Sequence, residues 1–231
     1  MAFQAFTTRF IAAASIAGLL AISGCSSTGT STNAGSSGRG DPVQTASRVI
    51  DYGPKATATR TGEVYLMRGL ADVFSRGMDV MAAKLNRAGV FAYSGSYSDW
   101  HEMADTIIAR NKRKEVSYPV VIMGHSLGAN DASKMATYLG ANGVHISYVV
   151  MFDPTVPGRV GKNIDKVVNY YIPNEDNRVY KGAGFTGTLQ NISMANKEDI
   201  THTTIEKNPR LQGTVISNIM SITKRMPRKK S

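Results

Sequence analysis

Apolar residues occur in two alternating patterns from about residue 63 onward. Short, nearly continuous apolar runs are typical of strands buried on both faces of a sheet, whereas apolar residues three and four positions apart are typical of helices. We expect strands at 63–68, 90–93, 119–123, 146–152 and 166–172, with the run 119–123 at the centre. This alternation predicts an α/β domain with a mostly parallel sheet of about five to six strands, helices on both faces and no large lid.

Helical spacing is found in four segments. One face of the first carries Met78 to Leu85, and the second, Trp100 to Ile108, runs into the basic residues 112–114, which suit a helix C-terminus. The third includes Gly128 to Leu139, and a final helix is expected near 211–222. The Asn- and Gly-rich stretch from the last strand to about Thr201 is expected to be irregular.

The N-terminus has the features of a secretory signal peptide, residues 1–24. A single positive charge precedes an apolar run, 10–22, that is too short to span a bilayer, and small residues follow it. Ile-Ser-Gly-Cys at 22–25 resembles the lipobox of bacterial lipoproteins, which implies that Cys25 carries lipid. A plain signal peptide or short membrane helix is the alternative. The lipoprotein resemblance implies the bacterial cell envelope, with the chain anchored to the periplasmic face of the outer membrane.

Composition divides the mature chain into three parts. Residues 25–48 are rich in Ser, Thr, Gly and Asn and are expected to form a flexible tether. Residues 49–223 have the length of one compact domain, and 224–231 form a basic tail. The net charge of +10 falls to +4 when Arg9 and the five basic residues of the tail are set aside.

The basic tail has two interpretations: a solvated end, or a segment attracted to anionic lipid or cell-wall polymer. Nucleic acid is not an expected partner, because the chain lacks the interleaved aromatic and basic residues typical of single-strand binding. The sequence does not indicate the oligomeric state.

Residues 124–128 read Gly-His-Ser-Leu-Gly, a G-x-S-x-G motif between an apolar strand and an amphipathic helix. In this context the motif predicts a nucleophile elbow, a tight turn that exposes the hydroxyl of Ser126 above the sheet. Small flanking residues are needed because the turn brings backbones close together. The backbone N–H of Leu127, at the start of the helix, is the predicted first oxyanion donor.

A serine hydroxyl needs a base, and the chain has four histidines, at 101, 125, 145 and 202. His202 is the predicted base, because it follows the last predicted strand and gives the order Ser, acid, His. A surface histidine without a role is the alternative. The acid is Asp153, at the end of the fourth strand, or Asp176, after the fifth. The cost of burying an unpaired carboxylate next to an apolar strand favours Asp153.

These motifs resemble those of the α/β-hydrolase superfamily over residues 64–205, and the elbow is similar to that of lipases and thioesterases. The run 148–154 resembles the acid segment of thioesterase domains from polyketide and nonribosomal peptide synthetases, which adds weight to Asp153. Most α/β-hydrolases place the acid one strand later, so Asp176 stays open. The superfamily implies a second oxyanion donor after the first strand, at the N–H of Leu70. An ordinary loop is the alternative there. Arg68 replaces a common histidine and is expected to pair with Asp72 or Glu63, or to face an anionic substrate group.

The sequence therefore predicts a serine hydrolase that cleaves acyl esters, of lipids or other molecules and including thioesters, through an acyl-enzyme. No metal or organic cofactor is expected, because His, Cys and Asp ligands are not clustered. Two alternatives remain: a membrane-tethered acyltransferase, in which an alcohol or amine replaces water, and a non-catalytic binding protein on a hydrolase fold.

Overall fold

The computed structural model describes residues 52–54, 57–70, 75–174 and 176–227. The predicted signal peptide 1–24, Cys25 and the tether 25–48 lie outside the described residues, as do the last four residues of the basic tail. Within the described ranges, no helix combines the length and apolar character needed to cross a membrane.

The main sheet consists of six parallel strands in the order β2-β1-β3-β4-β6-β8. Their bounds are β1 Glu63–Arg68, β2 Phe91–Ser96, β3 Val120–His125, β4 Ile146–Phe152, β6 Lys166–Tyr171 and β8 Thr188–Ser193. The chain adds β2 on one side of β1 and then adds β3 and the later strands on the other side. The strand order therefore reverses between β1 and β3. In open α/β sheets such a reversal places ligand sites at the carboxyl ends of the strands.

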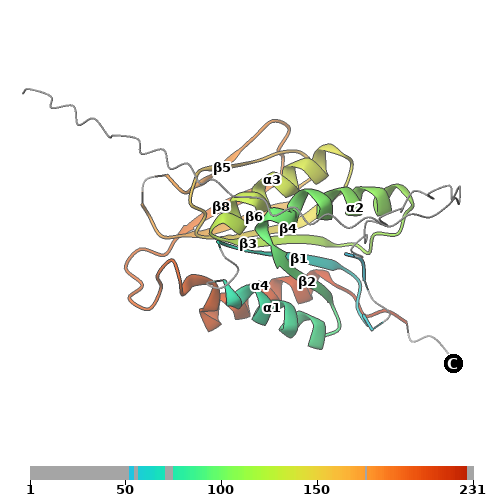
Figure 1. The fold of residues 1–231 in the computed structure, drawn as a ribbon, viewed down its shortest axis with the longest axis horizontal. Helices are drawn as coiled ribbons and strands as arrows, with labels where there is room; N and C mark the ends of the chain where they lie inside the picture. The colour runs from blue at the N-terminus through green and yellow to red at the C-terminus, as the bar shows by residue number, and fades with distance from the viewer. Residues whose placement is uncertain (1–51, 55–56, 71–74, 175, 228–231) are drawn as a thin grey trace, which may run out of the picture. The chain divides into compact units, whose positions relative to one another are not determined.

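Helices cover both faces of this sheet (Figure 1). On one face lie α1 (Arg76–Arg87) and α4 (Pro209–Ile222), and on the other lie α2 (Trp100–Lys112) and α3 (Leu127–Ala141). Two short 3-10 helices, Tyr97–Asp99 and Ile205–Lys207, precede α2 and α4. The predicted α/β architecture with helices on both faces is confirmed.

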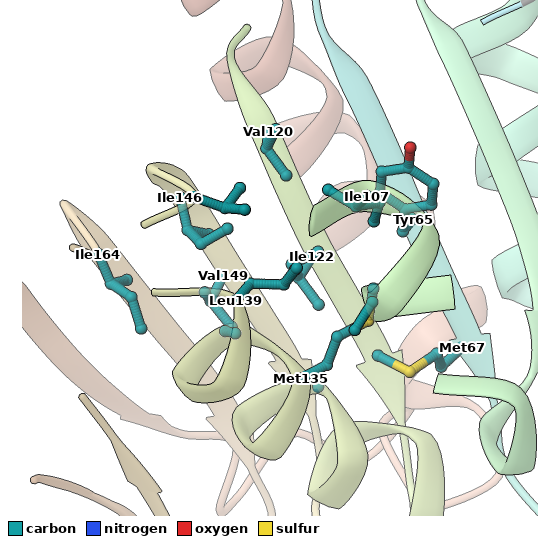
Figure 2. Close-up of a cluster of buried hydrophobic side chains, with 14 of the residues drawn as sticks. Tyr65, Met67, Ile107, Val120, Ile122, Met135, Leu139, Ile146, Val149 and Ile164 are labelled. Atoms are coloured by element: carbon teal, nitrogen blue, oxygen red, sulfur yellow. The ribbon is translucent and has the colours of Figure 1, made fainter. Parts of the chain in front are cut away.

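Side chains that alternate along the strands build one core on each face. From β1, Tyr65 and Met67 pack toward α2 and α3, whereas Val64 and Leu66 pack toward α1 and α4. Figure 2 shows the first of these cores, where Met135 and other residues of α3 contact the sheet. Each large apolar side chain that is fully buried contributes about 1.5–3 kcal/mol of transfer free energy. All six residues of β3 are buried, which confirms its predicted central position.

Three short or exposed strands differ from the sequence prediction. The stretch up to Thr201 was expected to be irregular, but it contains β7 (Val179–Lys181) and β8. β7 pairs with β5 (Gly158–Val160), which is also not predicted. In β8 only Leu189 and Ile192 are even half-buried, so this edge strand lacks the apolar pattern that reveals β3 and β4. β5 and β7 have three residues each, too few for a periodicity to be read.

Two buried or half-buried arginines tie helices to β1. Arg110 of α2 forms a bidentate ion pair with the fully buried Glu63, with nitrogen-to-oxygen distances of 2.7 and 2.8 Å. Arg68 pairs with Asp79 of α1 at 2.9 Å. The expected pairing of Arg68 with Glu63 is therefore wrong, because the two residues occupy opposite ends of a strand that is about 17 Å long. The other expected partner, Asp72, lies outside the described residues.

Candidate active site

Ser126 lies in the tight turn between β3 and α3. Its φ and ψ of 58° and −124° are unusual for a residue with a side chain, and such strain is characteristic of functional turns. The turn requires glycine on both sides. A Cβ atom on Gly124 would lie 2.0 Å from the carbonyl oxygen of Gly128, and one on Gly128 would lie 2.3 Å from the carbonyl oxygen of Met67. The local geometry of the predicted elbow is thus present.

His202 reaches the hydroxyl of Ser126 from the loop that follows β8. Its Nε2 lies 3.0 Å from Ser126 Oγ, and its Nδ1 lies 2.7 Å from Asp153 Oδ2. A carboxylate only accepts hydrogen bonds, so Nδ1 carries the proton and Nε2 is free to accept the hydrogen bond of the serine hydroxyl. The three predicted residues are thereby brought into one hydrogen-bonded chain.

Asp153 follows β4 directly and is held by several donors. Its φ is positive, 49°, and its side chain is 2% exposed. Oδ1 accepts hydrogen bonds from the backbone N–H of Ile172 at 2.9 Å and from Nδ2 of Asn177 at 2.8 Å, which leaves Oδ2 for His202. Both oxygens of the buried carboxylate accept hydrogen bonds, which offset the free-energy cost of burying its charge.

The second candidate acid, Asp176, is placed elsewhere. Its carboxylate accepts hydrogen bonds from the hydroxyl of Tyr180 and lies 3.6 Å from Nε of Arg178. These contacts hold the carboxylate to its own loop at the surface. Of the two candidates that the sequence left open, Asp153 is the one in contact with His202.

The pKa of His202 is raised above its ordinary value of 6.5. The main cause is the hydrogen bond to Asp153, which stabilises the protonated ring, and the charges of Asp153 and Glu206 act in the same direction. Partial burial opposes the rise. The site therefore favours uptake of a proton by His202, which is what a base must do when it activates a hydroxyl.

The other three histidines have different contacts. His101 stacks on Trp100 with ring centroids 3.6 Å apart, and His145 lies 2.8 Å from Asp165 at the surface. His125 is buried, and its ring nitrogens contact the hydroxyl of Ser75 and the backbone carbonyl oxygen of His202.

The two predicted oxyanion donors are Leu127, which follows Ser126 in the chain, and Leu70, which follows Gly69. Leu127 is the first residue of α3, so its N–H has no acceptor within the helix. Leu70 follows β1, and the loop before it is close to the serine, since a Cβ atom on Gly69 would lie 2.9 Å from Ser126 Cβ. Residues 71–74, which continue this loop, are outside the described part of the chain.

Sequence reasoning missed two residues around this site, Asn177 and Ser75. Asn177 holds Asp153 from a loop 24 positions later, and Ser75 contacts both Gly69 and His125. Neither residue belongs to a motif, so no local signal marks them. Within the described ranges, no group of three or more His, Cys, Asp or Glu side chains is arranged to hold a metal ion.

A cavity of about 760 Å³ runs along α3. Its wall includes Asn130, one helical turn beyond Ser126, and continues to Ala141 at the other end of the helix. Tyr138 and Val156 line it together with polar residues and the charged side chains of Lys134, Arg159 and Asp176. Ser126 itself is not part of the lining, so the cavity adjoins the elbow rather than enclosing it.

Comparison with known proteins gives one family match. Residues 66–166 match the model of the thioesterase domain family. The matched segment contains Ser126 and Asp153 but ends before His202. No curated protein matches the chain.

Three of the solved structures that match this chain are the following. A protein described as a hydrolase of the alpha/beta superfamily from Xanthomonas campestris pv. campestris is 15% identical, with a TM-score of 0.40, over 69% of this chain and 99% of that one. The NocB thioesterase domain from the nocardicin cluster is 14% identical, with a TM-score of 0.41, over 71% and 94%. Est1E from Butyrivibrio proteoclasticus is 13% identical, with a TM-score of 0.46, over 73% and 90%.

Proposed function

We propose that this chain is a hydrolase of the α/β-hydrolase superfamily that cleaves acyl esters or thioesters by means of Ser126, His202 and Asp153. The match of residues 66–166 to the thioesterase domain family supports this proposal. The observation that carries the proposal is the continuous hydrogen-bonded chain from Asp153 through His202 to Ser126. In this arrangement the base contacts the nucleophile, and a third group orients the base. The position of the site also supports the proposal. Ser126 and Asp153 follow the carboxyl ends of β3 and β4, beside the point where the strand order reverses.

In the first step, His202 Nε2 takes the proton of the Ser126 hydroxyl while Oγ attacks the acyl carbonyl carbon. The negative charge that develops on the carbonyl oxygen is stabilised by the N–H groups of Leu127 and Leu70. His202 then gives the proton to the departing alkoxide or thiolate, which leaves as alcohol or thiol. The acyl group remains bonded to Ser126 Oγ.

In the second step, His202 removes a proton from water, and the oxygen attacks the acyl-enzyme. Collapse of the second tetrahedral intermediate returns the proton to Ser126 Oγ and releases the carboxylic acid. The buried carboxylate of Asp153 holds the His202 ring in the required tautomer and stabilises its protonated form in both steps.

The N-terminal sequence supports a location outside the cytoplasm. We place the hydrolase at the bacterial cell envelope, with lipid on Cys25 anchoring it to the periplasmic face of the outer membrane. Its substrates are then acyl esters of lipids or other envelope molecules, rather than thioesters of cytoplasmic carriers. The cavity along α3 is the proposed site for the part of the substrate distant from the scissile bond, because its volume falls in the range of roughly 300–1,000 Å³ typical of ligand pockets.

Hydrolysis of a series of chromogenic acyl esters and acyl thioesters tests the proposal. Ser126→Ala is expected to abolish turnover, whereas Ser98→Ala, at an exposed serine, is the matched control and should retain it. Products are analysed with and without an acceptor alcohol, because an ester product would indicate acyl transfer instead. A wild-type chain as inactive as Ser126→Ala on every substrate would leave a binding protein as the remaining interpretation.

A further inference from the structure

His125 connects Ser75, directly before α1, with the loop that carries His202. Its side chain is 2% exposed, and both ring nitrogens have partners. Nδ1 lies 2.8 Å from the hydroxyl of Ser75, and Nε2 lies 2.7 Å from the backbone carbonyl oxygen of His202. The Ser75 hydroxyl oxygen in turn accepts a hydrogen bond from the backbone N–H of Gly69 at 2.8 Å.

The chemistry of the partners assigns every proton in this linkage. A carbonyl oxygen can only accept, so His125 Nε2 carries a proton and donates a hydrogen bond to the backbone carbonyl oxygen of His202. Burial lowers the pKa of His125 to about 4, so the ring is neutral at neutral pH and Nδ1 is an acceptor. Nδ1 therefore accepts a hydrogen bond from the hydroxyl of Ser75, whose oxygen in turn accepts from the N–H of Gly69. No donor or acceptor in the linkage is left unsatisfied.

At one end of the linkage, His125 holds the backbone of His202, the proposed base. Apart from the contacts of His202, the hydrogen bonds described for residues 199–204 stay within residues 197–208. The bond from His125 thus attaches the main chain of this loop to β3. His202 has a half-exposed side chain, so its placement depends on such an anchor.

The other end fixes Gly69, the residue before the second proposed oxyanion donor. Gly69 directly precedes Leu70, which is 61% exposed and has little packing of its own. Ser75 is buried immediately before α1, and its hydroxyl holds Gly69 against the elbow. A donor in an oxyanion hole acts only if its direction is set before the charge develops.

We infer that Ser75 and His125 are positioning residues, which hold Gly69, next to Leu70, and the main chain of His202 at fixed places beside Ser126 through one buried hydrogen-bonded linkage. The inference rests on the proposed function, since it assigns the linkage a purpose in that reaction. Neither residue touches the substrate or transfers a proton. Glu206 faces the same ring, with Oε2 at 3.8 Å from His125 Nε2, but the shorter bond to the His202 carbonyl determines where the His125 proton points.

Substitutions can cut the linkage at chosen bonds. Ser75→Ala removes the bonds to Gly69 and to Nδ1. In His125→Gln the amide group reaches the Nε2 position and keeps the bond to His202, whereas in His125→Asn it reaches the Nδ1 position and keeps the bond to Ser75. The two amide variants therefore separate the two ends while retaining a polar side chain of similar size.

The test measures ester hydrolysis by the full-length chain, with active sites counted by fluorophosphonate titration. Ser75→Ala is expected to lower kcat about tenfold with KM nearly unchanged. This loss of kcat is smaller than the loss expected on removing an oxyanion donor, because the N–H of Leu70 is still present. The double variant Ser75→Ala, His125→Gln should lose no more than about twofold beyond Ser75→Ala, because both changes break the same bond. His125→Asn is expected to slow labelling of Ser126 as well as turnover.

Hydrogen exchange measured on the same proteins gives a readout that does not need activity. Ser75→Ala should speed exchange at residues 69–70, and His125→Asn should speed exchange at 199–204, with the rest of the sheet unchanged. A wild-type enzyme that is active and a Ser75→Ala variant with unchanged kcat would overturn the positioning role and leave the function intact. An inactive wild type would refute the proposed function, and unchanged exchange in both loops would then also refute the linkage.

Discussion

Replacing Asp153 with asparagine should lower kcat/KM for ester hydrolysis by about 10⁴-fold, the size of loss seen when the acid of a serine triad becomes an amide. In the present chain, Oδ2 of Asp153 accepts the hydrogen bond of His202 Nδ1, while Oδ1 accepts from Ile172 and Asn177. The amide oxygen can keep the Oδ1 contacts, which leaves the NH₂ group facing His202. His202 must then place its proton on Nε2, where it cannot accept the proton of Ser126.

A 10⁴-fold loss corresponds to about 5.4 kcal/mol of transition-state stabilisation. Steady-state kinetics on a soluble chromogenic ester measure it, and the loss should fall on kcat rather than on KM. Asp176→Asn tests the rival acid, which contacts Tyr180 and Arg178. Asp165→Asn is the matched control, because this exposed carboxylate pairs with His145 and does not line the cavity along α3. The reasoning is refuted if Asp153→Asn retains activity within about tenfold of wild type, or if Asp176→Asn is the more damaged variant.

Three further results are expected. Arg110→Leu should reduce the free energy of unfolding by about 3–5 kcal/mol, because it leaves the buried carboxylate of Glu63 without its cation; a loss below about 1 kcal/mol in denaturant titrations would contradict this. The pH profile of kcat/KM should fall on acidification with an apparent pKa above 6.5, since His202 must be neutral to act as a base and its pKa is raised; an apparent pKa below 6.5 would argue against this assignment. Val156→Trp, in the cavity wall, should lower kcat/KM for long-chain esters about tenfold relative to short ones, whereas Val80→Trp, at a similarly exposed site on α1, should not; equal effects on all chain lengths would exclude the cavity as a substrate site.

Burial explains which parts of the fold could be predicted. β3 and β4 are covered on both faces, so their sequences are continuous apolar runs and their positions follow from the sequence. β8 lies at the sheet edge, and only two of its six residues are half-buried, without the alternation that would predict a strand from the sequence. Its strand conformation depends on hydrogen bonds to β6, a partner that no local pattern identifies.

The residues of the candidate site also differ in how far the sequence alone predicts them. Ser126 was predictable because the tight turn requires the G-x-S-x-G sequence around the serine. His202 was predictable because it is the one histidine in the sequence after the last predicted strand. Asp153 and Asp176 both follow strands that end on the same side of the sheet, so only their three-dimensional contacts separate them. Ser75 is brought to the site by the packing of α1 against the sheet, and nothing in its neighbourhood in the sequence indicates this.

Labelling with a fluorophosphonate probe, followed by mass mapping of the modified peptide, tests the central claim most directly. The probe reacts with a serine whose hydroxyl is activated by a neighbouring base, and it does not depend on knowing the substrate. We expect a single adduct on Ser126, formed more than about 10³-fold more slowly in His202→Ala. A folded wild-type chain that remains unlabelled, or an adduct at a different serine, would contradict the assignment of Ser126 as an activated nucleophile.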